Sequence, residues 1–347
     1  MELTDEVREP LELARGLGGV LHLAPLDGYA DAMTRATSRL LDDGADALHV
    51  TQAVAAVNDV LTSRLLALAE AHLGPPPFAY AWLALGSHGR GEQVLSSDQD
   101  SALAYGGPRL HGGPPREYYP ALAALVVDGL ARAGIPRCSG GYMATTWWHP
   151  LEELAELFRR WVDHPLPAAL LRAEVFLDVR PVHGDLDVAV LGDLLVRGGG
   201  DGTFVLQMAR AAVSFRPPRI IFGRLHTDHG VLDVKRAGTA AIVLLARLYA
   251  LAAGSAARTT TSRLEAAREA RALSPSGVEQ LTDAYRLLTE LRLRHQVQQV
   301  RAGQVPDNRV RVDALSRADQ RRLRDAVRTV RVVQEVTENR YATHTVT

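Results

Sequence analysis

The sequence has almost no cysteine. Cys138 is the only one among 347 residues, so the chain can form neither an internal disulfide nor a cysteine-rich zinc site. Such scarcity is typical of proteins in a reducing compartment, and we expect a cytoplasmic location.

Long apolar runs are missing too. No run reaches the roughly 18 to 20 residues that a membrane-spanning helix needs. The N-terminal stretch MELTDEVREPLELARGLGG is acidic and lacks the basic start and apolar core of a secretory signal. We therefore expect no secretion and no membrane partner.

Charge of one sign is not in excess. The 39 Lys+Arg and 40 Asp+Glu residues leave a formal net charge of -1, so any phosphate has to be recognised locally and not by a global positive field. The C-terminal arginines of RADQRRLRDAVRTVR alternate with Asp319, Asp325 and apolar residues, which favours a solvated helix face over a nucleic-acid interface. Nucleic acid is therefore not an expected partner.

Short apolar segments predict a small sheet. Residues 78–85 are apolar and aromatic and lead into the turn Gly86-Ser87, and residues 97–105 follow as a second strand. A third strand is predicted within 135–146 and the last strong one within 173–184.

Apolar residues at spacings of three and four predict helices around these strands. We divide the chain into a helical region 1–75, an α/β domain 76–200 and a helical domain 201–347. The expected fold class is α+β, with a small mixed β-sheet, a helical N-terminal lead and a C-terminal helical bundle. The predicted helical ranges are 25–72, 116–133, 151–162, 166–171, 185–197, 202–215, 236–253, 259–272, 275–302 and 313–341.

Two aspartates, Asp98 and Asp100, stand one residue apart in the second predicted strand. Residues i and i+2 of a strand point to the same face, so the two carboxylates would project together and repel unless a cation lies between them. Magnesium is the natural candidate, because it prefers oxygen ligands shared between carboxylates and phosphates. Taken alone, this pattern is more typical of a solvated strand end.

The residues before the pair favour the metal interpretation. Gly86 lets the backbone approach a ligand closely, and Ser87 can cap the next helix and donate its hydroxyl to a phosphate. Arg90 lies in that helix and can fork onto phosphate oxygens. This order can place a nucleoside triphosphate between a helix N-terminus and a metal pair; the alternative is a capped helix after a buried strand.

The stretch GSHGRGEQVLSSDQDSAL, residues 86–103, resembles the G-S-x-G-R-x-E-Q…D-Q-D motif of a nucleotidyltransferase family. That family is related to the bacterial PII uridylyltransferases within the DNA polymerase β-like superfamily. Its members often carry CBS or cyclic-nucleotide-binding modules upstream, for which we expect no room here. The resemblance extends over HVTQAVAAVNDVLTSRLLALAE, GGYMATTWW and FLDVRPVHGD, and over HGVLDVKRAGTAAIVLLARLYAL, TSRLEAA, AYRLLTELRLRHQ and PDNRV of a helical substrate-binding domain.

The resemblance implies a two-metal transfer of a nucleoside monophosphate from an NTP, with pyrophosphate leaving and Mg²⁺ or Mn²⁺ as cofactor. Asp98 and Asp100 would hold metal, and by motif position Asp178 would be the third carboxylate. The alternative for Asp178 is a strand residue paired with Arg180 or Arg172. The predicted triphosphate contacts are Gly86, Ser87 and Arg90. The family more often has asparagine at the position of Ser101, which puts a nearby ligand contact in doubt.

Lysine is the rarest basic residue. Lys235 is the only lysine, and the other 38 basic residues are arginines. Its survival in such a chain suggests a need for a compact ammonium charge. It shares a D-x-K pattern with Asp233 that matches the family's helical domain. We therefore predict that Lys235 binds the triphosphate in a cleft between the α/β and helical domains, the alternative being a salt bridge to Asp233 or Asp228.

Several questions stay open at this level. The base of the NTP and the acceptor, a protein or a small molecule with a hydroxyl, are not determined, and a homo-oligomer is possible. Two other functions fit the same pattern, a nucleotide sensor that does not turn over and a helical interaction protein with the α/β part as scaffold. Four histidines are predicted to be solvated or satisfied locally and not metal ligands: His164, His183, His226 and His229.

Overall fold

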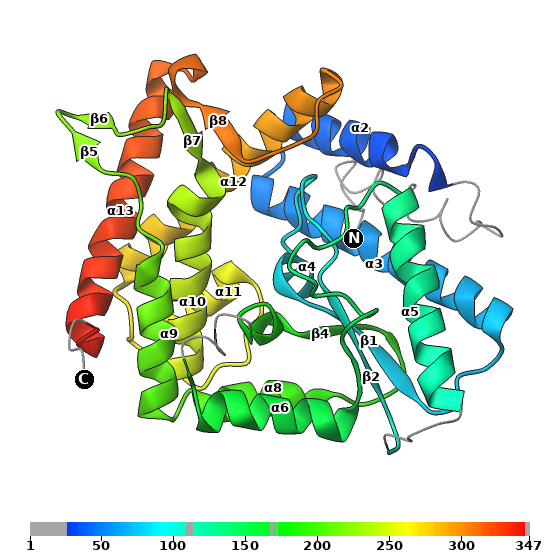
Figure 1. Cartoon of the computed structure of the whole chain (residues 1–347). Helices are drawn as coiled ribbons and strands as arrows, with labels where there is room; N and C mark the ends of the chain where they lie inside the picture. Colours follow the sequence, from blue (N-terminus) through cyan, green and yellow to red (C-terminus); the bar gives the residue numbers. More distant parts are fainter. Residues whose placement is uncertain (1–25, 109–113, 167–169, 171–172, 344–347) are drawn as a thin grey trace, which may run out of the picture. The chain divides into compact units, whose positions relative to one another are not determined.

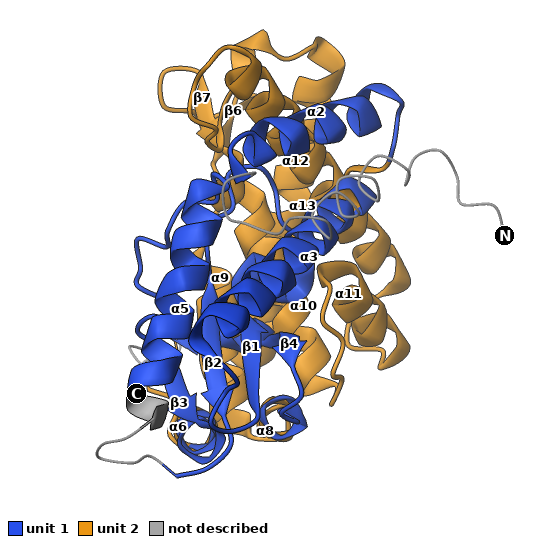
Figure 2. Cartoon of the chain, turned by 90° about the vertical axis from the view of Figure 1, so that its right-hand side faces the viewer, with its two compact units in different colours: residues 1–45, 49–159, 173–192 blue, residues 46–48, 160–172, 193–347 orange. Residues whose placement is uncertain are grey.

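A computed structural model of the chain describes residues 26–108, 114–166, 170 and 173–343 (Figure 1). The acidic N-terminal stretch, most of the predicted helix 166–171 and Arg172 lie outside the described residues. The chain forms two compact units (Figure 2). Unit 1 contains residues 1–45, 49–159 and 173–192, and unit 2 contains residues 46–48, 160–172 and 193–347. The expected α+β fold class is confirmed.

Unit 1 is built on a four-stranded sheet in the order β3-β2-β1-β4. Strand β1 pairs antiparallel with both β2 and β4, whereas β2 pairs parallel with β3. Ala84, the last residue of β1, lies opposite Ser101, the first of β2, and opposite Arg180, the first of β4. The segments after β1, before β2 and before β4 therefore meet at one edge of the sheet. The strands are β1 (Tyr80–Ala84), β2 (Ser101–Tyr105), β3 (Trp148–Pro150) and β4 (Arg180–Gly184).

The strand predictions need three corrections. The second strand begins at Ser101 and not at residue 97, because residues 98–100 pair with another loop through a single bridge. The third strand is Trp148–Pro150, just beyond the predicted range 135–146. The fourth is only Arg180–Gly184, because the chain before it turns through a 3-10 helix, η3 (Phe176–Asp178). An apolar run does not by itself distinguish a buried turn from a strand.

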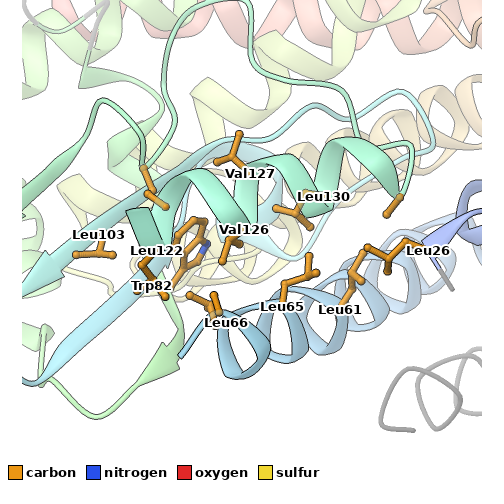
Figure 3. Close-up of a cluster of buried hydrophobic side chains, with 14 of the residues drawn as sticks. Leu26, Leu61, Leu65, Leu66, Trp82, Leu103, Leu122, Val126, Val127 and Leu130 are labelled. Atoms are coloured by element: carbon orange, nitrogen blue, oxygen red, sulfur yellow. The ribbon is translucent and has the colours of Figure 1, made fainter. Parts of the chain in front are cut away.

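Helices α2 (Tyr29–Asp42), α3 (Ala47–Leu73) and α5 (Pro114–Arg132) contribute to the core of unit 1. Leucines of α3 and branched residues of α5 pack on Trp82 and Leu103 of the sheet (Figure 3). Full burial of one such side chain stabilises the fold by roughly 1.5–3 kcal/mol. The residues labelled in that view are Leu26, Leu61, Leu65, Leu66, Trp82, Leu103, Leu122, Val126, Val127 and Leu130.

Short helices complete the mixed part of the chain. Helix α4 (Gly86–Arg90) follows β1, and helices α6 (Leu151–Asp163) and α8 (Ala189–Gly198) each extend from unit 1 into unit 2. Phe158 of α6 and Phe176 of η3 are both fully buried and meet edge to face within unit 1. This contact helps to fix the turn that carries Asp178.

Unit 2 is mainly a helical bundle around α10. All but two residues of α10 are buried. A helix that is apolar on every side belongs in the centre of a bundle. Side chains of Asp201, Thr259, Ser274 and Ser316 accept backbone N–H groups at the starts of four helices. The helices are α9 (Gly202–Ser214), α10 (Ala240–Ala252), α11 (Thr260–Glu269), α12 (Pro275–Arg301) and α13 (Arg317–Tyr341).

Unit 2 also holds two small two-stranded sheets that the helical prediction missed. Strands β5 (Ile220–Ile221) and β6 (Arg224–Leu225) form a hairpin, and the distant strands β7 (Val231–Asp233) and β8 (Arg309–Arg311) pair antiparallel in the other. Strands of two or three residues are too short to show a period of two. None of the helices that the structure describes is both long and apolar enough to cross a membrane.

Candidate functional site

Three segments that are distant in the sequence meet around Gly86 at the sheet edge. The N–H of Leu85 donates to the backbone oxygen of Asp100 at 3.0 Å, and the N–H of Gly86 donates to that of Val175 at 3.0 Å. These two bonds connect the Gly-Ser turn to the D-x-D segment and to the turn before Asp178. The Gly86 N–H therefore serves the fold, whereas the sequence suggested that its backbone would face a ligand.

Gly86 has a structural reason to lack a side chain. Its φ is +53°, and a Cβ at this position would lie 2.9 Å from Oδ2 of Asp100. The Asp100 carboxylate thus rests directly against the turn. Helix α4 has Leu85 as its N-cap, so the half-buried Ser87 is not the capping residue that the sequence suggested. The absence of a side chain at Gly86 therefore makes room for the Asp100 carboxylate.

This contact gives a testable prediction. We expect Gly86→Ala to weaken divalent-cation binding by about 10-fold and to lower the free energy of unfolding by about 1–2 kcal/mol, because the added methyl displaces the carboxylate. Calorimetric Mn²⁺ titration and urea unfolding measure the two effects. Gly74→Ala is the matched control, since Gly74 has φ +87° and nothing within 4 Å. Equal cation affinity in both variants would contradict the idea that Gly86 makes room for the Asp100 carboxylate.

The two aspartates of the D-x-D motif lie side by side as the spacing predicted. Asp98 and Asp100 are half-buried and flank Gln99, which forms an isolated parallel bridge with Arg137. One oxygen from each carboxylate and Sγ of Cys138 all lie within 4.8 Å of one another. Among the described residues this is the one group of three or more Asp, Glu, His or Cys side chains placed to share a metal ion.

Cys138 was not among the site residues predicted from the sequence. No local pattern connects this cysteine to a pair of aspartates about forty residues earlier. Burial raises the pKa of the Cys138 thiol to about 11, with further increases from the Asp100 and Asp98 carboxylates, while a hydrogen bond with the Tyr142 backbone opposes the rise. Without a cation, the thiol is protonated at neutral pH.

Asp178 and Arg90 bind each other. Nη1 of Arg90 donates to Oδ2 of Asp178, and Nε of Arg90 lies 2.8 Å from Oε2 of Glu92. The Asp178 side chain has no exposed area, and that of Arg90 is 12% exposed. Asp178 lies in η3 before β4, so the predicted strand position is corrected. Among the described residues its ion-pair partner is Arg90, whereas Arg180 pairs with Asp59. Arg172, the other partner considered, lies outside the described residues.

Helix α4 is held on its other side by a second ion cluster. Oδ1 of Asp59 lies 2.7 Å from Nε2 of His88 and 2.9 Å from Nη2 of Arg180. Arg180 also donates to the backbone oxygens of His88 and Gly89, near the end of α4, where a cation is favourable. Burial alone would raise the pKa of Asp59, but the hydrogen bonds from His88 and Arg180 outweigh it and lower the pKa. This contribution to stability is therefore present above about pH 4 and is lost as the pH falls through the folded-state pKa.

A small cavity with both polar and apolar walls adjoins the aspartate pair. Asp98, Asp100 and Gln99 line it together with Asn58 and Gln93, and it has room for about one water molecule. Nδ2 of Asn58 donates to Oε1 of Gln93 at 2.9 Å. Gln99 is 4% exposed, and its Oε1 is buried without a hydrogen-bond partner in the described part of the chain. A buried, unsatisfied amide oxygen of this kind favours an ordered water or ion nearby.

The remaining sequence candidates lie elsewhere or have structural contacts. Ser101 is buried, and its hydroxyl accepts the N–H of Ala144 at 3.1 Å. Lys235 is exposed in unit 2, at the start of the π-helical turn η4 (Lys235–Thr239) that leads into α10. His183 lies 3.6 Å from Glu70, and His229 lies 3.7 Å from Asp228. Within the described residues, no histidine belongs to a group suited to a metal.

The donor set suits a divalent cation. Asp98 and Asp100 offer oxygens at an accessible edge of the sheet, and oxygen is the ligand that Mg²⁺ and Mn²⁺ prefer. The water-sized cavity that the pair lines has room for a water ligand of such an ion, and Gln99 between the two aspartates has a buried oxygen without a partner among the described residues. These residues therefore fit a divalent-cation site.

Two family models match the chain. The model described as "Putative nucleotidyltransferase DUF294" matches residues 31–168, and the model described as "Putative nucleotidyltransferase substrate binding domain" matches residues 202–341. The first range includes α4 and the aspartate pair, and the second includes all five bundle helices. Asp178 lies outside both ranges. No curated protein matches the chain.

Proposed function

The chain belongs to the nucleotidyltransferase family whose two models it matches, and from this premise we propose that it transfers a nucleoside monophosphate from an NTP to an acceptor hydroxyl. Pyrophosphate is the second product, and Mg²⁺ or Mn²⁺ is required. The acceptor is a protein or a small molecule. The observation that carries the proposal is the side-by-side placement of Asp98 and Asp100 against the Gly86 turn, at the edge where β1 ends and β2 and β4 begin.

The pair's role follows from its charge and position. Two half-buried carboxylates this close are favourable when a cation neutralises them. A divalent ion bound there would supply charge stabilisation for the phosphoryl oxygens of an NTP. Asp98 and Asp100 would hold that ion, and the half-buried hydroxyl of Ser87 in the adjoining helix is the proposed contact to the triphosphate.

The contacts of Asp178 and Arg90 favour a supporting role. Each was expected at the ligand, Asp178 on metal and Arg90 on phosphate. Because the guanidinium binds both Glu92 and Asp178, it keeps α4 against the η3 turn. A Cβ on Gly89 of α4 would lie 1.7 Å from the backbone oxygen of Asp178, so the two segments are in direct contact. We propose that the ion pair positions the Gly86 turn.

The test is a transfer assay with every NTP. The protein is incubated with each labelled NTP and Mg²⁺ or Mn²⁺ in a cell lysate, which is then separated into protein and small-molecule fractions. We expect label in one fraction together with pyrophosphate. Binding is measured separately, since an NTP at 100 times its Kd stabilises the fold by about 2.7 kcal/mol, and here only with the cation present. Binding without label in either fraction would contradict transfer and identify a nucleotide sensor.

Lys235 is a further proposed contact to the triphosphate. We expect Lys235→Arg to lower kcat/KM for the NTP by roughly 10-fold, because a planar guanidinium cannot replace a compact ammonium group. Thermal stability should stay within about 1 kcal/mol, as for most exposed positions. Steady-state kinetics and thermal unfolding measure both. Arg236→Lys, at the neighbouring exposed position, is the control. Equal kinetics in the two variants would make Lys235 an accident of composition.

A further inference from the structure

Cys138 is fixed beside the aspartate pair by the backbone on both sides of it. The N–H of Gln99 donates to the oxygen of Pro136 at 2.9 Å, and the N–H of Ser101 donates to the oxygen of Tyr142 at 2.9 Å. A turn closes between them, with the N–H of Gly141 donating to the oxygen of Cys138 at 3.2 Å. The loop that carries the thiol thus runs along residues 99–101, and the position of Sγ follows from backbone pairing.

The surroundings of this thiol differ from those of an ordinary buried cysteine. A structural cysteine acts as a small apolar group among other apolar groups. Sγ of Cys138 instead lies within 4.8 Å of oxygens from Asp98 and Asp100, and these oxygens lie equally close to each other. Donor atoms that share one tetrahedral ion are separated by about 3.3–3.8 Å, given metal–sulfur and metal–oxygen bonds of about 2.0–2.3 Å. Small side-chain adjustments bring all three onto one ion.

An independent feature supports a bound ion with water. Asp98 and Asp100 also line the water-sized cavity, and Gln99, which is 4% exposed, lines it with a buried Oε1 that lacks a partner among the described residues. An ion held by three protein donors keeps a further position for water. The cavity, which both aspartates line, gives that water a place.

We propose that Cys138 Sγ is the third protein ligand of this site, so that the site binds a thiophilic divalent cation of the zinc class through one sulfur and two carboxylates. The inference rests on the proposed function only for the location of the metal. On binding, a bond forms between the metal and Sγ, and the thiol proton passes to solvent. Sulfur selects zinc and cadmium, whereas magnesium takes oxygen ligands. Cys138 therefore adds affinity for Zn²⁺ and Cd²⁺ but none for Mg²⁺.

Cadmium titration tests the ligand set directly. A thiolate bound to Cd²⁺ absorbs in the ultraviolet, and the band reports on Cys138 alone because the chain has no other cysteine. We expect the band to saturate at one Cd²⁺ per chain. In Asp98→Asn and in Asp100→Asn the Kd should rise about 10-fold or more. Asp128→Asn, which changes an exposed carboxylate paired with Arg137 in the same region, should leave it unchanged.

Titrations with zinc and with magnesium complete the test. In calorimetric titrations we expect Cys138→Ser to lose about 10-fold or more in Zn²⁺ affinity and to keep its Mg²⁺ affinity. Cys138→Ala provides a second variant in case serine disturbs the buried loop, and circular dichroism checks both folds. A native chain without the band, or a band with the same Kd in both aspartate variants, would overturn the proposal.

The outcome separates this inference from the proposed function. Pyrophosphate release by the native chain is measured with Mg²⁺ in parallel. If the cadmium band appears and depends on the two aspartates, but no NTP gives pyrophosphate release, Cys138 is confirmed as a ligand and the transferase proposal is wrong. If the native chain releases pyrophosphate with Mg²⁺ but shows no cadmium band, the transferase proposal stands and the proposal of Cys138 as a ligand is wrong.

Discussion

Asp98→Asn and Asp100→Asn are each expected to reduce nucleotidyl transfer by at least about 100-fold while the chain stays folded. Asparagine has almost the same shape as aspartate but no negative charge, so the change removes the attraction for a divalent cation and preserves packing. Both side chains are half-buried at the sheet edge, and neither belongs to the hydrophobic core. Pyrophosphate release at saturating Mg²⁺ measures the effect, and circular dichroism checks the fold.

Asp128→Asn is the matched control for this pair. Asp128 lies in α5, is 66% exposed, and forms an ion pair with Arg137, the residue that bridges to Gln99. Asp128→Asn removes one negative charge near the same segment and leaves the donor atoms of Asp98, Asp100 and Cys138 unchanged. Near-normal turnover in either Asp98→Asn or Asp100→Asn, with Asp128→Asn also normal, would remove the pair from the metal site.

Asp178→Asn is expected to lower the free energy of unfolding by about 3 kcal/mol. The carboxylate is fully buried and binds Arg90, so its neutralisation leaves a nearly buried guanidinium with a weaker partner. A metal ligand behaves differently, because its neutralisation impairs transfer at little cost to the apo fold. Urea unfolding without divalent cation therefore distinguishes the ion pair from the ligand role that the resemblance implied.

A double-mutant cycle sharpens that test. Arg90→Met combined with Asp178→Asn should recover part of the loss, with a coupling energy above about 1 kcal/mol. Glu156→Gln is the control, since Glu156 pairs with Arg159 on an exposed helix face and should cost less than about 1 kcal/mol. An unfolding free energy for Asp178→Asn equal to that of the control would return Asp178 to the list of candidate metal ligands.

The sequence alone determined the features that depend on neighbours along the chain. Helix periodicity located the bundle and α5 to within a few residues, because packing against one face imposes a repeat that the sequence must show. The spacing of Asp98 and Asp100 determined that their carboxylates lie together. The motif that begins at Gly86 identified the family, since its glycines, charges and aspartates occur in fixed order.

Only the tertiary structure decided which distant residues meet. Sequence placed Arg90 on phosphate and Asp178 on metal, whereas the folded chain brings them together across 88 positions in a buried pair. It left Cys138 unassigned, and the backbone bridge between Gln99 and Arg137 brings that thiol to the aspartates. The physical reason is common to both cases: a local pattern specifies the direction of a side chain, but its partner is set by sheet order and long-range backbone pairing, which no short stretch of sequence encodes.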